Sequence, residues 1–192
     1  MKLIVIALTA VLLTASCTQE KDPFLIENGS VGLLTKDTRV SQLDSIFALD
    51  SLVKNTPGQQ QFIGGDIEIY DKAGSLLMVL SPAVIGADSS KIKNIQIKDS
   101  RFTTAKGLNA ASTFKQIKDN YTVNNILNSM SSVIVSITDS DAYVIIDKKQ
   151  LPESLRYTTN AIEATQIPDA ATFKFFMVEW DQSNQEENNS DE

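Results

Sequence analysis

The chain has 192 residues, a formal net charge of −7 and no histidine. The lack of histidine excludes Ser-His-Asp and Cys-His catalytic arrangements and every His-ligated metal site. The acidic balance argues against nucleic acid binding, which depends on clustered lysine and arginine.

Residues 1–16 have the features of a secretory signal peptide. Lys2 precedes an apolar run of 11 residues, from Leu3 to Leu13, interrupted only by Thr9. A membrane-spanning helix needs about 20 such residues, so this run is too short to span. Small residues follow at 14–16, and a charged start, a short apolar centre and small residues are typical of a cleaved secretory signal.

Cys17 is the only cysteine of the chain and follows the small residues directly, in the stretch L-T-A-S-C. This stretch resembles the lipobox of bacterial lipoproteins. The resemblance implies that the Cys17 sulfur receives a diacylglyceryl group, that the chain is cut before Cys17, and that the new amine is acylated. Two or more acyl chains hold a protein stably on a membrane. The alternative is a free cysteine beside an ordinary cleavage site, which leaves the odd thiol of an exported chain without a role.

Two polar segments flank the part of the chain that can fold. Residues 17–25 predict a tether between the lipid and the domain. Residues 181–192 carry five acidic side chains, no basic one and no apolar one. Such a segment cannot bury enough surface to offset its ordering entropy, so the sequence predicts an acidic, disordered tail.

The region between these segments divides into two similar halves, predicted at 26–100 and 101–180. Each half has a Gly-Leu pair, at positions 32–33 and 107–108, followed by a candidate helix N-cap, Thr38 or Ser112. After each cap the apolar residues recur at offsets of three and four, which predicts one buried helical face. These residues are Val40, Leu43 and Phe47 in the first half, and Phe114, Ile117 and Tyr121 in the second.

Strands are predicted after each helix. In the first half they cover 66–71, 75–80 and 91–99, with a turn at 73–74 and a phase change near Asn94 that is consistent with a bulge. In the second half they cover 131–139, 142–147 and 172–180. The predicted fold class is therefore α+β, built from two tandem units of a helix and an antiparallel sheet.

This arrangement resembles the fold of beta-lactamase inhibitory protein (BLIP-like) and, as a single unit, that of the small outer-membrane lipoprotein BamE. The matching positions are Gly32, Thr38, Val40 and Leu43, then Gly107, Ser112, Phe114 and Ile117. The overall character of the sequence also resembles that of uncharacterised lipoproteins of Bacteroidota. In that group acidic residues soon after the cysteine, here Glu20 and Asp22, can accompany export to the cell surface.

Few residues offer catalytic chemistry. Pairs of carboxylates remain as candidate catalytic groups, because glycoside hydrolysis needs only two carboxyl groups. Asp139 and Asp141 flank Ser140 in a predicted hairpin turn, where aspartate is favoured for bonding its own backbone. Asp66 and Glu68 are expected to face solvent on an amphipathic strand. The Gly pair within 63–66 is most simply interpreted as an ordinary turn. No cofactor or metal site is predicted.

The last predicted strand offers a candidate interface. Phe173, Phe175 and Met177 alternate with Phe176, Val178 and Trp180, so both faces of this strand are largely apolar. A strand apolar on both faces is usually buried between layers. At a sheet edge, one face would instead be an exposed aromatic patch of the kind that marks interfaces. The candidate interface residues are Phe173, Phe175, Phe176 and Trp180. For Tyr70 and Tyr143, each in a predicted strand, burial in the core and exposure at an interface are likewise both open.

The sequence thus favours a lipid-anchored module of the bacterial cell envelope that binds another protein through a sheet face or edge and has no catalytic activity. Cys17 would hold it on the outer membrane, on the periplasmic side or exposed at the surface. Two alternatives remain open: a carbohydrate-processing accessory or enzyme that uses surface carboxylates such as Asp139 and Asp141, and a structural envelope component.

Overall fold

The computed structural model describes residues 22–55 and 65–180, and its fold is α+β with far more strand than helix. An antiparallel sheet of eight strands forms the centre, in the order β4-β5-β6-β7-β12-β11-β10-β9. Its strands are β4 (Ser51–Lys54), β5 (Ile67–Tyr70), β6 (Leu76–Pro82), β7 (Ile92–Ile97), β9 (Val123–Asn128), β10 (Ser132–Ile137), β11 (Ala142–Asp147) and β12 (Phe175–Glu179).

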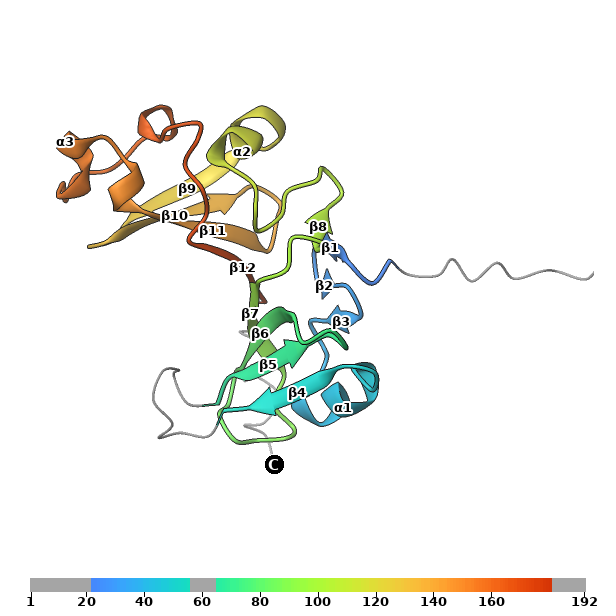
Figure 1. Cartoon of the computed structure of the whole chain (residues 1–192). Coiled ribbons are helices and arrows are strands. Elements are labelled where there is room, and N and C mark those ends of the chain that lie inside the picture. The colour runs from blue at the N-terminus through green and yellow to red at the C-terminus, as the bar shows by residue number, and fades with distance from the viewer. Residues whose placement is uncertain (1–21, 56–64, 181–192) are drawn as a thin grey trace, which may run out of the picture.

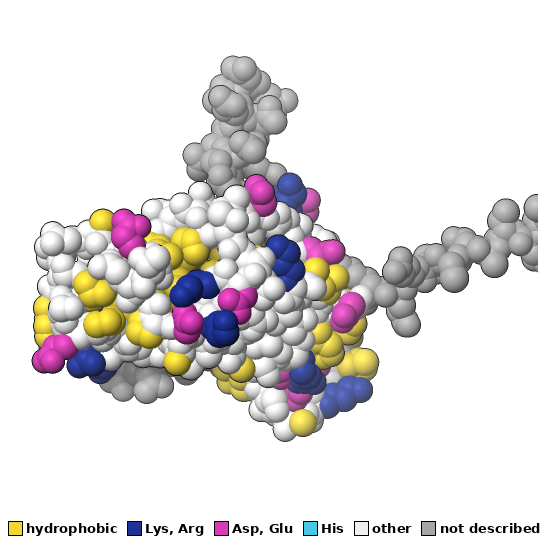
Figure 2. Space-filling model, turned by 90° about the horizontal axis from the view of Figure 1, so that it is seen from above, with side chains coloured by type: hydrophobic (Ala, Val, Ile, Leu, Met, Phe, Trp, Pro, Cys, Tyr) yellow, Lys and Arg dark blue, Asp and Glu magenta, His cyan; other side chains and the backbone are white. Residues whose placement is uncertain are grey.

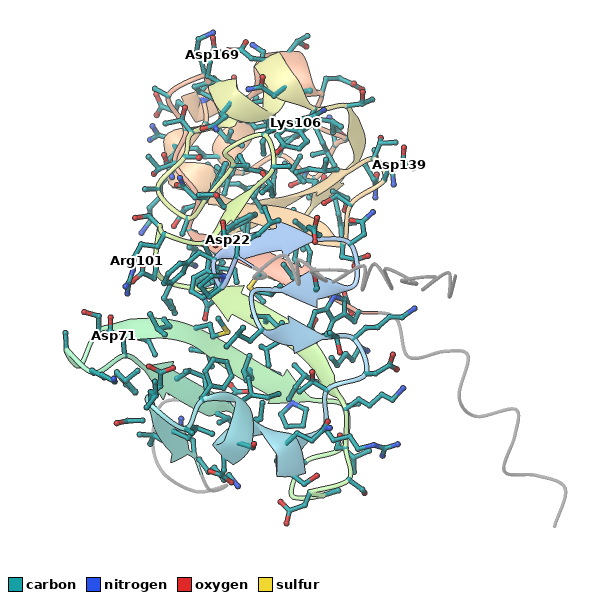
Figure 3. The ribbon with its side chains drawn as sticks, turned by 90° about the vertical axis from the view of Figure 1, so that its right-hand side faces the viewer. Asp22, Asp71, Arg101, Lys106, Asp139 and Asp169 are labelled. Atoms are coloured by element: carbon teal, nitrogen blue, oxygen red, sulfur yellow. The ribbon has the colours of Figure 1, made fainter. Side chains whose placement is uncertain are left out.

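A second, smaller sheet has the order β3-β2-β1-β8. Its strands are β1 (Leu25–Glu27), β2 (Ser30–Val31), β3 (Leu34–Thr35) and β8 (Thr103–Thr104). It lies beside the middle of the large sheet, between the part that contains β4–β6 and the part that contains β9–β11 (Figures 1 and 3). The sequence did not predict these strands, because two or three residues are too few to display an alternation.

Apolar segments bounded by turn residues, with regular alternation in β5 and β7, correctly located six strands of the large sheet: β5, β6, β7, β10, β11 and β12. In β10, for example, Val133, Val135 and Ile137 are buried while the residues between them are half-buried. The expected irregularity near Asn94 is present, since the β6–β7 register shifts between the pairs Ser81–Asn94 and Pro82–Ile92. The edge strands β4 and β9 were not predicted, so each helix is followed by four strands of the sheet rather than three.

Both predicted helices are present and both begin one residue later than expected. The first consists of the 3₁₀ turn η1 (Val40–Gln42) and α1 (Leu43–Ile46), and the second is α2 (Phe114–Asn120). The predicted caps, Thr38 and Ser112, bond backwards instead: each hydroxyl oxygen accepts the backbone N–H of the residue three positions earlier, at 2.9 and 3.1 Å. Arg39 and Thr113 occupy the N-cap positions.

Further hydrogen bonds occur at matching places in the two halves. The first helical N–H donates to Ser90 in one half and to Ala171 in the other, just before the last strand of each. The second helical N–H donates to Asp88 and Asp169 in the same way. Isolated bridges also match, Arg39 with Lys91 and Thr113 with Thr172. These last strands, β7 and β12, pair with each other at the centre of the large sheet.

One hydrophobic core joins the two halves on the inner face of the large sheet. The apolar residues of both helices are buried there as expected, except that Tyr121 is only partly buried. The small sheet adds Ile26, Val31 and Leu34 to the same cluster. The remaining short helices are η2 (Lys148–Gln150), α3 (Glu153–Arg156) and η3 (Ala164–Gln166), in the connection between β11 and β12.

Of the two glycines singled out in the sequence, Gly32 is the more constrained. Both have positive φ, +54° and +79°, but a Cβ on Gly32 would lie 2.2 Å from the Pro23 carbonyl oxygen, whereas the nearest atom at Gly107 is 3.4 Å away. We expect Gly107→Ala to lower the free energy of unfolding by about 1–2 kcal/mol through backbone strain alone. Gly32→Ala should cost about 1–3 kcal/mol more because of the backbone overlap. Urea denaturation of both variants measures the difference, and equal midpoints would contradict it.

Candidate interaction surface

The outer face of the large sheet is the surface opposite the core. Its registers form one row of side chains across all eight strands: Val53, Glu68, Val79, Gln96, Met177, Tyr143, Ser136 and Asn125. Over β10, β11 and β12 the outward residues are half-buried, while their neighbours in sequence are fully buried on the inner face. The second half of the sheet therefore presents an open face to its surroundings.

A neighbouring row on this face is apolar from end to end. Leu127 pairs with Ile134, Ile134 with Ile145, and Ile145 with Phe175, so the four side chains cross β9, β10, β11 and β12 in line. We call these four residues the outer apolar row. None of them belongs to the core cluster or packs against it. Leu127 at the sheet edge is 56% exposed.

The Phe175 end of the row is positively charged. The Lys98 Nζ lies 5.6 Å and the Lys174 Nζ 5.5 Å from the Phe175 ring centroid. An ammonium at this distance is attracted by the ring quadrupole. Neither lysine takes part in an ion pair with any of the described carboxylates. Both cations are therefore placed to meet an acidic group that contacts the row.

Tyr143 and Met177 border the row on the same face, and both are half-buried. Burial, with a smaller contribution from the negative charge of Glu179, raises the pKa of the Tyr143 hydroxyl above its usual range. The phenol therefore stays neutral at every physiological pH, and Tyr143 adds an uncharged aromatic surface beside the row.

The candidate interface read from the sequence is only partly correct. Phe176 and Trp180 point into the core and are 1% and 2% exposed, so neither can contact a partner on the surface. Phe173 is partly buried and packs against the core, with its ring centroid 6.3 Å from that of Phe176. Phe175 alone among the four lies on the open face. β12 is a central strand. Its even-numbered residues point into the core, and its odd-numbered residues point to the outer face.

Three residues of the row, Leu127, Ile134 and Ile145, were missed in the sequence. The signal that could have revealed the last two is the unbroken apolar run in each strand, Val133–Val135 and Tyr143–Ile146. Such a run means that apolar side chains alternate to both faces, including the face that the core does not cover. Leu127 has no comparable signal, since asparagines surround it.

The Asp141 carboxylate and the Asp139 backbone serve the fold. Asp139 has a φ of +55°, in the turn between β10 and β11. The Asp141 carboxylate accepts the Gly29 N–H at 2.6 Å, and the Asn28 side-chain amide donates to the Asp139 carbonyl at 2.7 Å. These bonds fasten the β1–β2 turn of the first half to a hairpin of the second. The two residues border a polar cavity of about 360 Å³ that Glu27, Lys106 and Tyr121 also line.

The expectation that Asp66 and Glu68 face solvent is wrong for Glu68. Glu68 is only 7% exposed, and its carboxylate accepts a hydrogen bond from the Tyr70 hydroxyl at 2.6 Å. This hydrogen bond, more than burial or charge, raises the pKa of Tyr70 above its usual range. Asp66 is half-buried and accepts from the Ser81 hydroxyl at 2.7 Å. Tyr70 is thus occupied by a structural contact.

An apolar cavity of about 400 Å³ lies near the start of the described chain, lined by Phe24, Phe47 and Phe102 among others. At its rim the Arg101 guanidinium bonds Asp99 and Asp71, each at 2.7 Å, and the Arg101 and Asp71 side chains lie on one side of the molecule (Figure 3). The turn N–H of Ser75 and then Arg101 lower the pKa of Asp71, and Arg101 lowers that of Asp99. The charge of Arg101 is thus balanced by those of Asp71 and Asp99.

Charged residues elsewhere are mixed in sign. On the face that carries α2, basic and acidic side chains lie side by side (Figure 2), as in the pairs Lys115–Asp119 and Lys118–Asp169. Residues 22–55 and 65–180 contain no cluster of three or more carboxylates that could hold a metal ion. Cys17, the tether before residue 22 and the tail 181–192 lie outside the described residues.

No helix in the described ranges has the length and apolar character needed to cross a membrane.

Comparisons with known proteins give a fold and no function. No protein-family model matches the chain, and no curated protein matches its sequence. Among solved structures, the chain is similar to the crystal structure of the uncharacterized protein yfeY from Escherichia coli, with a TM-score of 0.52 and 17% sequence identity. The match covers 81% of this chain and 99% of that one. It supports a mixed α+β fold over most of the described residues.

Proposed function

We propose that this protein is a lipid-anchored module of the bacterial cell envelope that binds another protein through the outer face of its large sheet. The chain offers few catalytic groups: it has no histidine, and the Asp141 carboxylate is bonded to the Gly29 N–H. We propose that it has no catalytic activity. The anchor is Cys17, and the outer membrane is the membrane to which it is attached.

The outer apolar row carries this proposal. Four apolar side chains in line, bordered by Tyr143 and Met177, lie on a face that belongs to no core. Contiguous apolar surface rimmed by polar groups typically marks a site of protein interaction. Aromatic residues and methionine are enriched at the centres of such interfaces, which matches Phe175, Tyr143 and Met177.

The charges around the row indicate what kind of protein would fit. Lys98 and Lys174 stand at one end of the row and have no described carboxylate to pair with. The complementary surface is therefore an apolar ridge with an acidic group at the end that meets Phe175. Like-charge contact at this end would be costly, so the two lysines also select against basic partners.

We also propose that the two halves are copies of one ancestral unit, as the BLIP-like resemblance implies. The support is the series of matching hydrogen bonds at Thr38 and Ser112, at the two helix starts, and at the bridges to Lys91 and Thr172. The central pairs agree with a two-fold relation, because Ile95 pairs with Val178 and Ile97 with Phe176. Only the second copy carries the outer apolar row.

Placing a charge in the row tests the proposed function. We expect Ile145→Glu to leave the chain folded, because this side chain lies on the outer face and outside the core cluster. It should reduce retention of the partner at least about tenfold by desolvating a carboxylate in the interface. The measurement is quantitative mass spectrometry of proteins cross-linked to the full-length chain in cells.

Val84→Glu is the matched control, since Val84 is an aliphatic residue, 60% exposed, in the loop before β7. A partner retained by the wild type and by Val84→Glu but lost from Ile145→Glu supports the proposal. If Ile145→Glu retains every protein that the wild type retains, the outer face is not the binding site.

A further inference from the structure

The strand β9 forms one edge of the large sheet. Within the described part of the chain it pairs with β10 and with no other strand. An edge strand presents backbone N–H and C=O groups that are free to pair with another extended chain. The row of Leu127, Ile134, Ile145 and Phe175 begins at this same edge.

The backbone groups that point away from the sheet can be assigned. The Ser129 N–H bonds the Ser132 carbonyl across the β9–β10 turn. Hydrogen-bonded and non-bonded pairs alternate along an antiparallel ladder. Leu127 and Asn125 therefore bond β10, whereas the N–H and C=O of Ile126 and Asn128 face the free edge. Asn124 has no partner at the register shift between the pairs Ser136–Asn125 and Ile137–Val123, so the alternation does not extend to it.

β9 has one feature that protects edges, the register shift at Asn124, and lacks the others. Natural edge strands often carry lysine or proline, or are very short. β9 has six residues with neither a charge nor a proline. By contrast β4, the opposite edge, has four residues and ends in Lys54, which lies 3.8 Å from Asp44.

Exposed apolar side chains gather at the end of β9. Leu127 is 56% exposed, Met130 in the following turn 95%, and Tyr157 90%. Met130 and Tyr157 line one cavity of about 330 Å³ with Asn128. An occupant that follows β9 beyond Asn128 would cover these side chains as well as the free backbone groups.

We infer that the partner supplies an extended, uncharged segment that adds to β9 as a ninth strand and continues onto Met130 and Tyr157; this rests on the proposed function and names the partner's chemistry. Free N–H and C=O groups that recur at every second residue of β9 can be paired by a partner only if the partner's backbone is extended. The uncharged edge calls for uncharged side chains, and the exposed leucine and methionine call for apolar ones.

The test uses the full-length chain in detergent and a fluorescent, uncharged peptide of alternating threonine and valine. We expect binding below about 1 mM by fluorescence anisotropy. Ile126→Pro removes an N–H that faces the free edge, which an edge strand tolerates. It should weaken peptide binding about tenfold. Ile126→Ala removes the same side chain but keeps the N–H, so it should bind as the wild type does.

Amide hydrogen exchange is the second readout. Without peptide, the N–H groups of Ile126 and Asn128 should exchange quickly and those of Asn125 and Leu127 slowly; with peptide all four should be protected. The inference is overturned if the peptide fails to bind, if Ile126→Pro binds it as well as Ile126→Ala does, or if Ile126 becomes protected with rising protein concentration alone, which would identify a second copy as the occupant.

The two proposals fail in different ways. If Ile145→Glu keeps its cellular partners while the peptide still protects Ile126, the outer face is not the binding site but the edge inference stands. If Ile145→Glu loses a partner while Ile126→Pro and Ile126→Ala bind the peptide equally, the face is the site and strand addition is wrong.

Discussion

Phe176→Ala is expected to lower the free energy of unfolding by about 3–5 kcal/mol, the usual cost of truncating a buried phenylalanine. The Phe176 side chain is 1% exposed, and its strand neighbours Ile97 and Val144 are buried beside it. Truncation would leave a cavity where the two halves of the sheet join. Total stabilities of domains are about 5–15 kcal/mol, so this change removes a large share. Urea denaturation at neutral pH measures it.

Phe175→Ala is the matched control, one residue earlier in the same strand. Its ring is half-buried on the outer face, near the lysines 98 and 174 and outside the core cluster, so we expect a loss of about 1 kcal/mol or less. Equal losses for the two variants would mean that both faces of β12 are covered, and the open face would have to be abandoned.

Cys17→Ala is expected to abolish attachment of acyl chains and release the protein from the outer membrane fraction. Acyl chains contribute about 0.8 kcal/mol per buried CH₂, and without them the apolar run 3–13 is too short to span a bilayer. Metabolic labelling with a fatty acid analogue, followed by separation of the membranes, measures both effects. Ser16→Ala keeps a small residue before the cysteine and should retain the label.

A Cys17→Ala protein that keeps its label and its membrane fraction would refute the anchor. Protease treatment of intact cells then locates the anchored wild type. Loss of the domain would place it on the cell surface and rule out an assembly role inside the envelope. Protection until the outer membrane is broken would place its partners in the periplasm.

Apolar segments bounded by turn residues predicted the centre of the large sheet well, as in β10, where the residues of one face are fully buried. The apolar faces of the two helices were also predicted, through Val40 and Leu43 in one and Phe114 and Ile117 in the other. These patterns depend on local periodicity, which the chain displays directly.

The features that failed depend on contacts between distant segments. The edge strand β9 reads V-N-N-I-L-N, a sequence too rich in asparagine to suggest a strand, and it is held by pairing with β10. Phe176 and Phe175 look alike in the sequence. Which of them is buried depends on the side of the sheet that the helices and the small sheet cover. Asp141 likewise appears free until the fold brings Gly29 to it.

Site-specific photo-cross-linking in living cells tests the central claim most directly. A photoreactive phenylalanine analogue would replace Ile145 in the full-length, anchored chain, with the same replacement at Val84 as the control. The account predicts a discrete protein adduct from position 145 that is absent from position 84. No adduct from position 145, or the same adducts from both positions, would contradict a protein-binding role for the outer face.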